Sequence, residues 1–423
     1  MSESPATDRS NLTLVLTTVL HAFTHAFGSM MVPLYLLMRD DLHLAGVSSA
    51  SAIVTVYGLV YCLFSYPAGV LADRVNRKAM LGVGLLGNAA CIVAIGLTRK
   101  YELIMLYGIL AGLFGTLFHP AANALVTAHY PKSPGMAIGL LGIGSGIGFF
   151  AGPQFAGWRA QTAHWHFASV GDWQRPLVEA GIAGLIVGIV FLFAASESHH
   201  QAQRISRPLG TKLRWRMIWI ALVIGLRDFA GVATLSLASI YLEVAHHLDA
   251  ARTGFILGAT MLSSIIVSPL AVYLSPGRRR LPVLACVLIC GGVVVATTSL
   301  WPMRFVIPVL MLYMAMQLGS YALSDAAMYE RVPPEVRGRI AGMFLTIAGT
   351  FSATAPFLMG WWTDALHGRA MVPAAYLPIF LTLGVMMVLA ATAMPLLARL
   401  GDVCDPPVRP LAEIMPATIE PAM

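Results

Sequence analysis

The placement of charge within apolar segments constrains this chain more than any other feature of its sequence. Twelve apolar segments are long enough to form membrane-spanning helices, and their interior ionisable residues fall almost only on the first, fourth, seventh and tenth. An ionisable group inside a bilayer is costly, and it usually faces a cavity or another such group. A recurrence on every third segment therefore predicts one shared polar pathway, as in a transporter. The residues concerned are His21, His25, His119, Arg227, Asp228 and Asp325.

The composition excludes a soluble protein. The chain is 57% hydrophobic and only 11% charged, whereas soluble domains average about 25% charged residues. The apolar runs are continuous over about twenty residues, which indicates helices and not the alternating strands of a barrel. We therefore predict an all-α membrane protein with twelve transmembrane helices. They are expected near 12–38, 47–71, 79–97, 103–126, 135–158, 177–196, 217–242, 253–275, 281–299, 304–330, 338–363 and 374–398.

The basic residues are distributed unevenly between the two sides of the predicted membrane. Of the 27 Lys and Arg residues, 18 fall in the tails and in the loops on their side, eight fall in the opposite loops, and Arg227 is intramembrane. This bias predicts a multi-pass protein of a bacterial-type inner (plasma) membrane with both termini cytoplasmic. The net charge of +7 then reflects topology and contact with anionic membrane lipids. Nucleic-acid binding is not expected, because the basic residues are dispersed over short loops.

The two halves of the chain resemble each other at an offset of about 202 residues, on either side of the polar segment 197–216. Gly28 corresponds to Gly231, His25 to Asp228, and Pro153 to Pro356. An even number of helices in each repeat predicts halves of parallel topology, related by an axis along the membrane normal. The expected organisation is an N-terminal six-helix bundle (1–200), a cytoplasmic linker (201–216), a C-terminal six-helix bundle (217–398) and a disordered cytoplasmic tail (399–423).

The loop between the second and third segments carries a recognisable motif. It reads Gly69-Val-Leu-Ala-Asp73-Arg74-Val-Asn76-Arg77-Lys78 and resembles the signature loop of the major facilitator superfamily. The resemblance implies two six-helix bundles that work by alternating access, with Asp73, Arg74, Arg77 and Lys78 forming a gate of ion pairs across the gap between the halves. Asn76 stands where the superfamily has glycine, and asparagine tolerates the positive φ expected there. The alternative is that the basic residues only enforce topology.

The fifth segment is dense in glycine and includes Gly148, Gly152, Pro153 and Gly157. Small residues four apart let helix backbones approach closely, and a Gly-Pro pair is expected to break hydrogen bonding and kink the helix. The segment resembles the Gly-x-x-x-Gly-Pro motif of the superfamily's antiporter subfamilies, which implies export by exchange. Close packing alone is the alternative explanation.

The intramembrane histidines lie on two segments that are expected to face one pathway. His21 and His25 are one turn apart, and His119 precedes Asn123 by one turn. Thr24-His25 together with Leu117-Phe118-His119-Pro120 resembles the fosmidomycin-resistance branch of drug efflux proteins within the superfamily. The chain departs from that branch after Pro120, where it lacks the branch's acidic and basic residues. Histidine titrates near neutrality and can carry a proton through a transport cycle; bonding substrate or serving as a structural residue are the alternatives.

Arg227, Asp228 and Asp325 are the charged candidates in the second half. Neighbouring positions on a helix do not face each other, so Arg227 and Asp228 are expected to point to different partners. Arg227 is suited to an anionic substrate group or to an internal counter-ion role, and Asp228 to proton binding. Asp325 belongs either to the same pathway or to a gate formed with Glu330, Arg331 and Arg337. The weaker pathway candidates are Tyr57, Tyr61, Gln154 and Gln317.

Enzymatic alternatives find little support in the sequence. His21-x-x-x-His25 has the spacing of a histidine box in membrane di-iron enzymes, but the loop histidines fall on opposite sides of the membrane. No metal or cofactor is therefore expected, and no phosphate-binding loop of an ATPase is present. We predict a proton-coupled secondary transporter that exports a small organic compound or drug and acts as a monomer. The alternatives are proton-coupled or facilitated uptake of a small metabolite and, more distantly, a transporter-like receptor.

Overall fold

The computed structural model describes residues 5–72, 74–162, 171–197, 209–333 and 336–403. Over these residues the chain forms helices and turns, without a β-strand. Asp73, most of the predicted linker and nearly all of the predicted tail lie outside the described residues.

The first half of the chain supplies nine α-helices, several of which join into longer spans. α1 continues through a short 3-10 turn, η1, into α2. α3 and α4 are bent by 44° at Phe64, and α6 and α7 are separated by a break just before Pro120. The bounds are α1 Pro5–Ser29, η1 Val32–Leu34, α2 Tyr35–Asp41, α3 Val47–Leu63, α4 Ser65–Ala72, α5 Arg77–Leu97, α6 Tyr101–Gly115, α7 Phe118–His129, α8 Pro134–Thr162 and α9 Gln174–Ala194.

The second half contains the remaining helices and two π-helical turns, η2 and η6. The turn η2 ends α10, and η6 joins α14 to α15. The bounds are α10 Thr211–Ile240, η2 Tyr241–Ala245, α11 Ala250–Leu274, η3 Gly277–Arg279, α12 Arg280–Ala296, η4 Thr298–Leu300, α13 Met303–Tyr329, α14 Arg337–Phe344, η6 Leu345–Gly349, α15 Thr350–Ser352, α16 Ala355–Asp364, η7 His367–Met371, η8 Pro373–Tyr376, α17 Leu377–Ala390, η9 Ala391–Ala393 and α18 Met394–Ala398.

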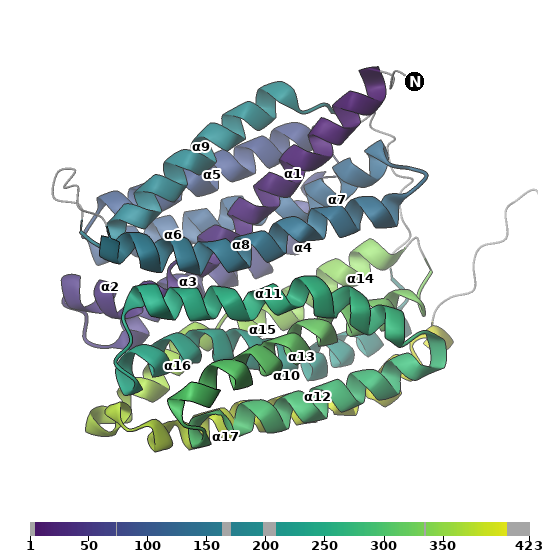
Figure 1. Cartoon of the computed structure of the whole chain (residues 1–423). Helices are drawn as coiled ribbons and strands as arrows, with labels where there is room; N and C mark the ends of the chain where they lie inside the picture. The colour runs from purple at the N-terminus through teal and green to yellow at the C-terminus, as the bar shows by residue number, and fades with distance from the viewer. Residues whose placement is uncertain (1–4, 73, 163–170, 198–208, 334–335, 404–423) are drawn as a thin grey trace, which may run out of the picture.

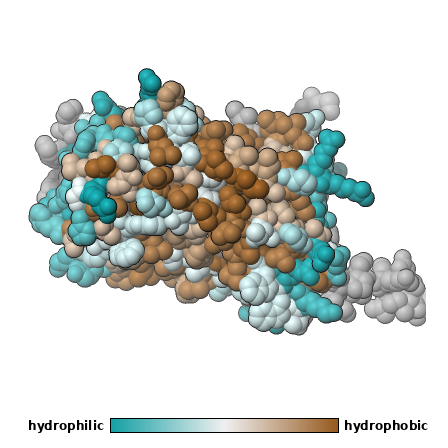
Figure 2. Space-filling model, turned by 90° about the horizontal axis from the view of Figure 1, so that it is seen from below, coloured by the Kyte–Doolittle hydropathy of each residue, from teal (hydrophilic) through white to brown (hydrophobic). Residues whose placement is uncertain are grey.

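The predicted all-α membrane fold is confirmed. Among the described residues, ten helices or continuous helix series are long and apolar enough to cross a membrane, and the bent pair α3–α4 makes an eleventh. The remaining predicted segment, 253–275, coincides with α11, where the side chains of residues 264–266, 268 and 269 lie outside the described ones. Figure 2 shows the corresponding surface, with hydrophobic residues across the middle and hydrophilic residues gathered at the two ends.

The helices run roughly along one common direction, with α1 to α9 in the upper part of Figure 1 and α10 to α17 in the lower part. The end of the molecule that carries α2 is termed the α2 end. The opposite end, where the chain starts, is termed the terminus end (Figure 1). Within the upper part α1 packs on α8 and α5 on α9, and within the lower part α12 packs on α17. The pairs α8–α11 and α3–α16 join the two parts.

Glycines bring α8 into backbone contact with two neighbouring helices. A Cβ atom at Gly144, Gly148 or Gly152 would collide with main-chain atoms of α1, and one at Gly157 would collide with the carbonyl of Ala250 on α11. The break expected at Pro153 does not occur, because α8 continues through that residue as one helix. Pro153 removes a single backbone donor, and the contacts on both sides of α8 hold the helix in place.

The face of α8 that meets α11 is covered at the α2 end only. Gly157 and Phe150 both touch α11 there, where the missing Cβ atoms of Gly254 and Gly258 allow the close approach. Gly142, Gly139 and Gly135 continue the same helical stripe toward the terminus end, and a Cβ at any of them would meet no described atom within 4 Å. The two helices therefore diverge toward the terminus end.

Candidate functional site

The histidines of α1 and α7 form one cluster. The ring of His119 lies 5.1 Å from that of His21 and 5.5 Å from that of His25, measured between ring centroids. The Nδ1 of His21 lies 2.7 Å from the carbonyl oxygen of Leu141 on α8. Because a carbonyl only accepts, this nitrogen carries the hydrogen, and Nε2 of neutral His21 is an acceptor. Nε2 of His25, at 3.0 Å, therefore donates to it.

Aromatic rings surround the histidine cluster. Phe118 stacks on His21 at 4.8 Å, Phe149 packs against His25 at 4.4 Å, and Tyr61 meets His119 edge-on at 6.1 Å. Asn123, one turn beyond His119, is exposed. The structure thus brings together the three predicted histidines, contributed by α1 and α7, and leaves Asn123 outside their contacts.

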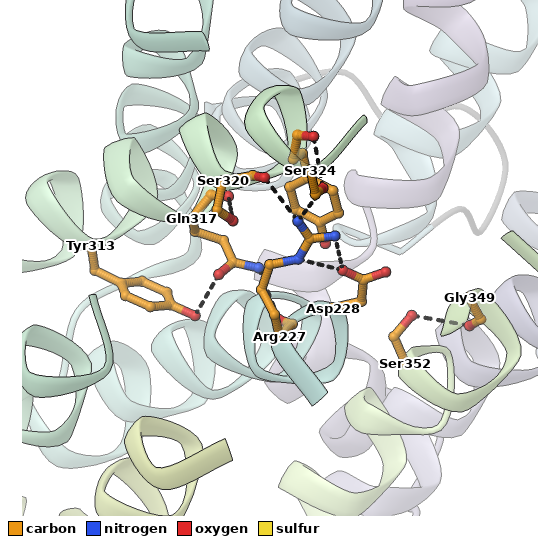
Figure 3. A network of polar contacts seen from close by, with 9 residues as sticks. Arg227, Asp228, Tyr313, Gln317, Ser320, Ser324, Gly349 and Ser352 are labelled. Atoms are coloured by element: carbon orange, nitrogen blue, oxygen red, sulfur yellow. Dashed lines mark hydrogen bonds and ion pairs between the residues drawn. The ribbon is translucent and has the colours of Figure 1, made fainter. Parts of the chain in front are cut away.

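Arg227 and Asp228 form a buried ion pair on α10, which overturns the expectation that they point apart. The Nε of Arg227 donates to Oδ1 of Asp228 at 2.7 Å, and Nη2 lies 2.6 Å from the same oxygen (Figure 3). The arginine side chain is long enough to fold back onto its neighbour, so the rule for adjacent helix positions fails here. Arg227 is fully buried and the Asp228 side chain is 9% exposed, so each charge depends on the other.

A polar stripe on α13 completes the environment of Arg227. Its Nη1 donates to the carbonyl oxygen of Ser320 at 3.0 Å and to the hydroxyl of Ser324 at 2.8 Å. The guanidinium lies over the ring of Tyr321, 4.0 Å from its centroid. The amide of Gln317 donates to the main-chain oxygen of Arg227 at 2.9 Å. Figure 3 shows these groups converging on Arg227, while the other oxygen of Asp228 points away from the guanidinium.

Asp325 belongs with this network and not with the charged residues at the end of α13. It interacts electrostatically with both Arg227 and Asp228. Glu330 instead forms ion pairs with Arg280 of α12 and with Arg331. The electrostatic interaction of Asp325 fits the first of the two placements left open by the sequence, in the same pathway as Arg227 and Asp228.

The signature loop is only partly described, because Asp73 lies outside the described residues. Arg74 is exposed, and Gly69 on α4 lies near Pro120. Arg77, expected to reach across the gap between the halves, is buried and donates to the carbonyl of Ala124 on α7 at 3.4 Å. Asn76 has φ −60° and caps α5 by accepting from the amide of Ala79, so the expected positive φ is wrong. Lys78 contributes its main-chain amide to Glu197 at 2.8 Å.

Sequence reasoning missed several polar groups of the site. Ser324 on α13 lies four residues after Ser320 and three after Tyr321, a polar stripe in an apolar segment that periodicity analysis could have found. Glu243 was also missed, because it falls just beyond the predicted edge of its segment. It is buried in η2 and accepts from the hydroxyl of Ser239 at 3.2 Å. That hydroxyl also donates to the carbonyl oxygen of Val32 at 2.9 Å, which joins η1 to α10.

The α2 end is closed by Asp364, the last residue of α16. Its carboxylate accepts from the main-chain amides of Val47 and Ser48, at 2.9 and 3.0 Å, and from the hydroxyl of Ser48 at 2.6 Å. Negative charge at a helix N-terminus is favourable, because the first amides lack partners and the helix dipole is positive there. A residue from one half of the chain thus caps α3 in the other half.

Replacing Asp364 with Ala is expected to open the α2 end. Loss of a helix cap costs about 1 kcal/mol, which corresponds to about a fivefold shift toward separated α3 and α16. Spin labels at Ala45 and Gly368, in a cysteine-free background, report this distance by electron double resonance. Asp249→Ala is the matched control, because Asp249 caps its own helix α11 through the amide of Arg252. An unchanged distance distribution in Asp364→Ala would show that the cap does not hold the closed state.

The amino-acid sequence is similar to those of known membrane transporters. The family model of the Major Facilitator Superfamily matches residues 15–356. A tetracenomycin C resistance and export protein of Streptomyces glaucescens is 32% identical over 156 residues, which are 37% of this chain and 28% of that protein. The multidrug resistance protein MdtG of Klebsiella pneumoniae is 34% identical over 178 residues, 40% of this chain and 41% of that protein. The matches thus span less than half of each relative.

Among solved structures, a bacterial homologue of the human lysosomal transporter Spinster, in an inward-facing and unoccupied conformation, superposes with a TM-score of 0.75. The sequence identity is 15%, and the superposition covers 95% of this chain and 98% of that one. At this identity the likeness concerns the fold alone.

Proposed function

Because the chain belongs to the major facilitator superfamily of membrane transporters, we propose that it exports a small organic compound in exchange for protons by alternating access. The observation that carries this proposal is the buried ion pair of Arg227 and Asp228 on α10, with the partly buried Asp325 of α13 in electrostatic interaction with it. Ionisable groups at this depth are retained where they act on ions or substrates. Asp228 is the proposed proton-binding carboxylate, and uptake of the proton would release its ion pair with Arg227, while Asp325 is a second carboxylate in electrostatic interaction with that arginine.

The histidine cluster is proposed as the substrate-facing counterpart of this network. His25 on α1 and Asp228 on α10 occupy equivalent positions in the internal repeat, so each half contributes one polar group at a similar depth. Imidazole nitrogens donate and accept hydrogen bonds, and the rings of Phe118 and Phe149 beside them offer apolar contact. This combination suits an organic compound with few polar groups.

Export is the favoured direction. The glycine-rich α8 resembles the helix-five motif of antiporters, and the two relatives compared above are named as resistance and export proteins. Proton-coupled uptake would release the proton on the same side of the membrane, but substrate and proton would then bind together instead of in turn.

The divergence of α8 and α11 supports alternating access. Along α8 and α11 the two halves meet at the α2 end and separate toward the terminus end, while α4 and α14 stay in contact with each other. If both termini are cytoplasmic, as the basic residues predict, separation along this seam would open toward the cytoplasm. In the opposite conformation the terminus end is proposed to be closed by Asp73, Arg74 and Lys78. A single chain in the lipid bilayer is proposed to suffice for this cycle.

The test is a sensitivity profile of a drug-hypersensitive bacterial host that expresses the chain, over a panel of antibiotics and metabolites. Resistance to one class of compound that disappears with a protonophore is expected. Flux of that compound is then measured in proteoliposomes under an imposed pH gradient, with empty liposomes as the control. Accumulation in cells driven by the same gradient would contradict export and identify an importer.

A further inference from the structure

We infer that His21, His25 and His119 form a binding site for one divalent transition-metal ion of the Zn²⁺, Ni²⁺ or Co²⁺ class. This inference concerns binding only and stands apart from the direction and coupling of the proposed transport. Among the described residues these histidines are the one group of three or more metal-ligating side chains close enough to share an ion, since their ligand atoms all lie within 4.8 Å of one another.

The spacing of the ligand atoms is near that of a coordinated site. A tetrahedral centre with metal–nitrogen bonds of about 2.0–2.1 Å separates its ligand nitrogens by about 3.3 Å. Nε2 of His21 and Nε2 of His25 are already 3.0 Å apart, and the ligand nitrogen of His119 lies within 4.8 Å of both. Two histidines one turn apart on a helix are a recurrent way of presenting two ligands to one metal.

The hydrogen bonding of the cluster prepares His21 to act as a ligand. Metal-binding histidines usually donate their other ring N–H to a carbonyl or carboxylate, which fixes the ring and its tautomer. His21 donates from Nδ1 to the carbonyl of Leu141, so its Nε2 lone pair points to the cluster. His25 needs one tautomer change, in which the hydrogen leaves Nε2 and Nδ1 gains one. Neither ring nitrogen of His119 has a hydrogen-bond partner among the described residues.

The donor set selects the class of ion. Three imidazoles without a carboxylate suit Zn²⁺, Ni²⁺ and Co²⁺, whereas Mg²⁺ and Ca²⁺ require oxygen ligands. Three protein ligands leave a fourth position for water or for a donor atom of another molecule. Tyr61, edge-on to His119, has a buried hydroxyl without a hydrogen-bond partner in the described part of the chain, and it is the spare polar group nearest to that position.

The test is metal binding by the full-length protein in detergent, after removal of any histidine tag. Titration calorimetry with ZnCl₂ is expected to give one site per chain, and MgCl₂ is expected to give none. Co²⁺ is expected to produce the intense visible absorption of a four-coordinate complex, which Zn²⁺ then abolishes by displacement. These measurements use the unaltered chain, so they do not depend on whether a variant folds.

Variants assign the ion to the cluster. His119→Gln is expected to weaken Zn²⁺ binding at least tenfold, on the scale at which altered coordination shells act. The paired control, His246→Gln with His247→Gln, removes two neighbouring histidines outside the cluster and is expected to leave the affinity unchanged. Absence of a one-to-one site in the unaltered chain would overturn the inference, as would equal affinity in His119→Gln. Either result leaves the transport proposal untouched, because that proposal is tested by flux without added metal.

Discussion

Replacing Asp228 with Asn is expected to abolish proton-driven transport while exchange of substrate across the membrane continues. Asp228 is the carboxylate that forms the ion pair with Arg227, and asparagine cannot bind and release a proton. Uphill transport should fall by about a hundredfold, the upper range of coupling between two sites. The measurement is flux in proteoliposomes under an imposed pH gradient, compared with substrate exchange in the absence of a gradient.

In this experiment a loss of protein stability has to be distinguished from a loss of proton coupling. Asn at position 228 leaves the guanidinium of Arg227 buried without its counter-ion, and breaking a buried ion pair costs about 3–5 kcal/mol. The double variant Arg227→Gln with Asp228→Asn removes both charges and is expected to recover expression and thermal stability, yet still to lack uphill transport. Normal uphill transport by the double variant would identify the pair as structural, and Asp325 would become the candidate for coupling.

Replacing Gly157 with Val is expected to separate α8 from α11 at the α2 end and to stop the transport cycle. A side chain there would overlap the main chain of Ala250, which cannot rotate away as a side chain can. Overpacking of this kind costs about 2 kcal/mol, or about a thirtyfold shift in population. Spin labels at the exposed residues Gln161 and Phe255 report the separation of the two helices by electron double resonance.

Gly142→Val is the matched control on the same helix. Its Cβ would meet nothing within 4 Å, and the substitution leaves the α2 end unchanged. The label distance should therefore equal that of the unaltered chain. If Gly157→Val also left the distance and the flux unchanged, the contact between α8 and α11 would not be needed for closure.

The sequence predicted the fold well because bilayer physics leaves few choices for such a chain. Each of the twelve apolar segments falls on a helix or helix series in the structure, since every backbone polar group in lipid has to be satisfied within its own helix. The main local errors of the prediction concern the positions at which helices are interrupted. Pro153 does not interrupt α8, whereas α14 gives way to a π-helical turn at Leu345 that no residue pattern indicated.

The sequence singled out the ionisable residues of the candidate site but not their contacts. The ionisable residues were visible because charge is rare in apolar segments. Their pairing was not, because the direction of a long arginine side chain depends on neighbours such as Ser320 and Ser324, which lie more than ninety residues away along the chain. The cap at Asp364 was equally hidden, since Asp364 and Val47 meet only through tertiary packing.

The glycine contacts between α8 and α11 have a thermodynamic consequence. Closing an interface built from side chains freezes their rotamers, at a cost that reaches about 1.5–2 kcal/mol for a long side chain. Gly157, Gly254 and Gly258 have no rotamers to lose, and their neighbours across the contact are largely main-chain atoms already fixed by helical hydrogen bonds. In the proposed transport cycle this seam can therefore form and separate with little change in conformational entropy.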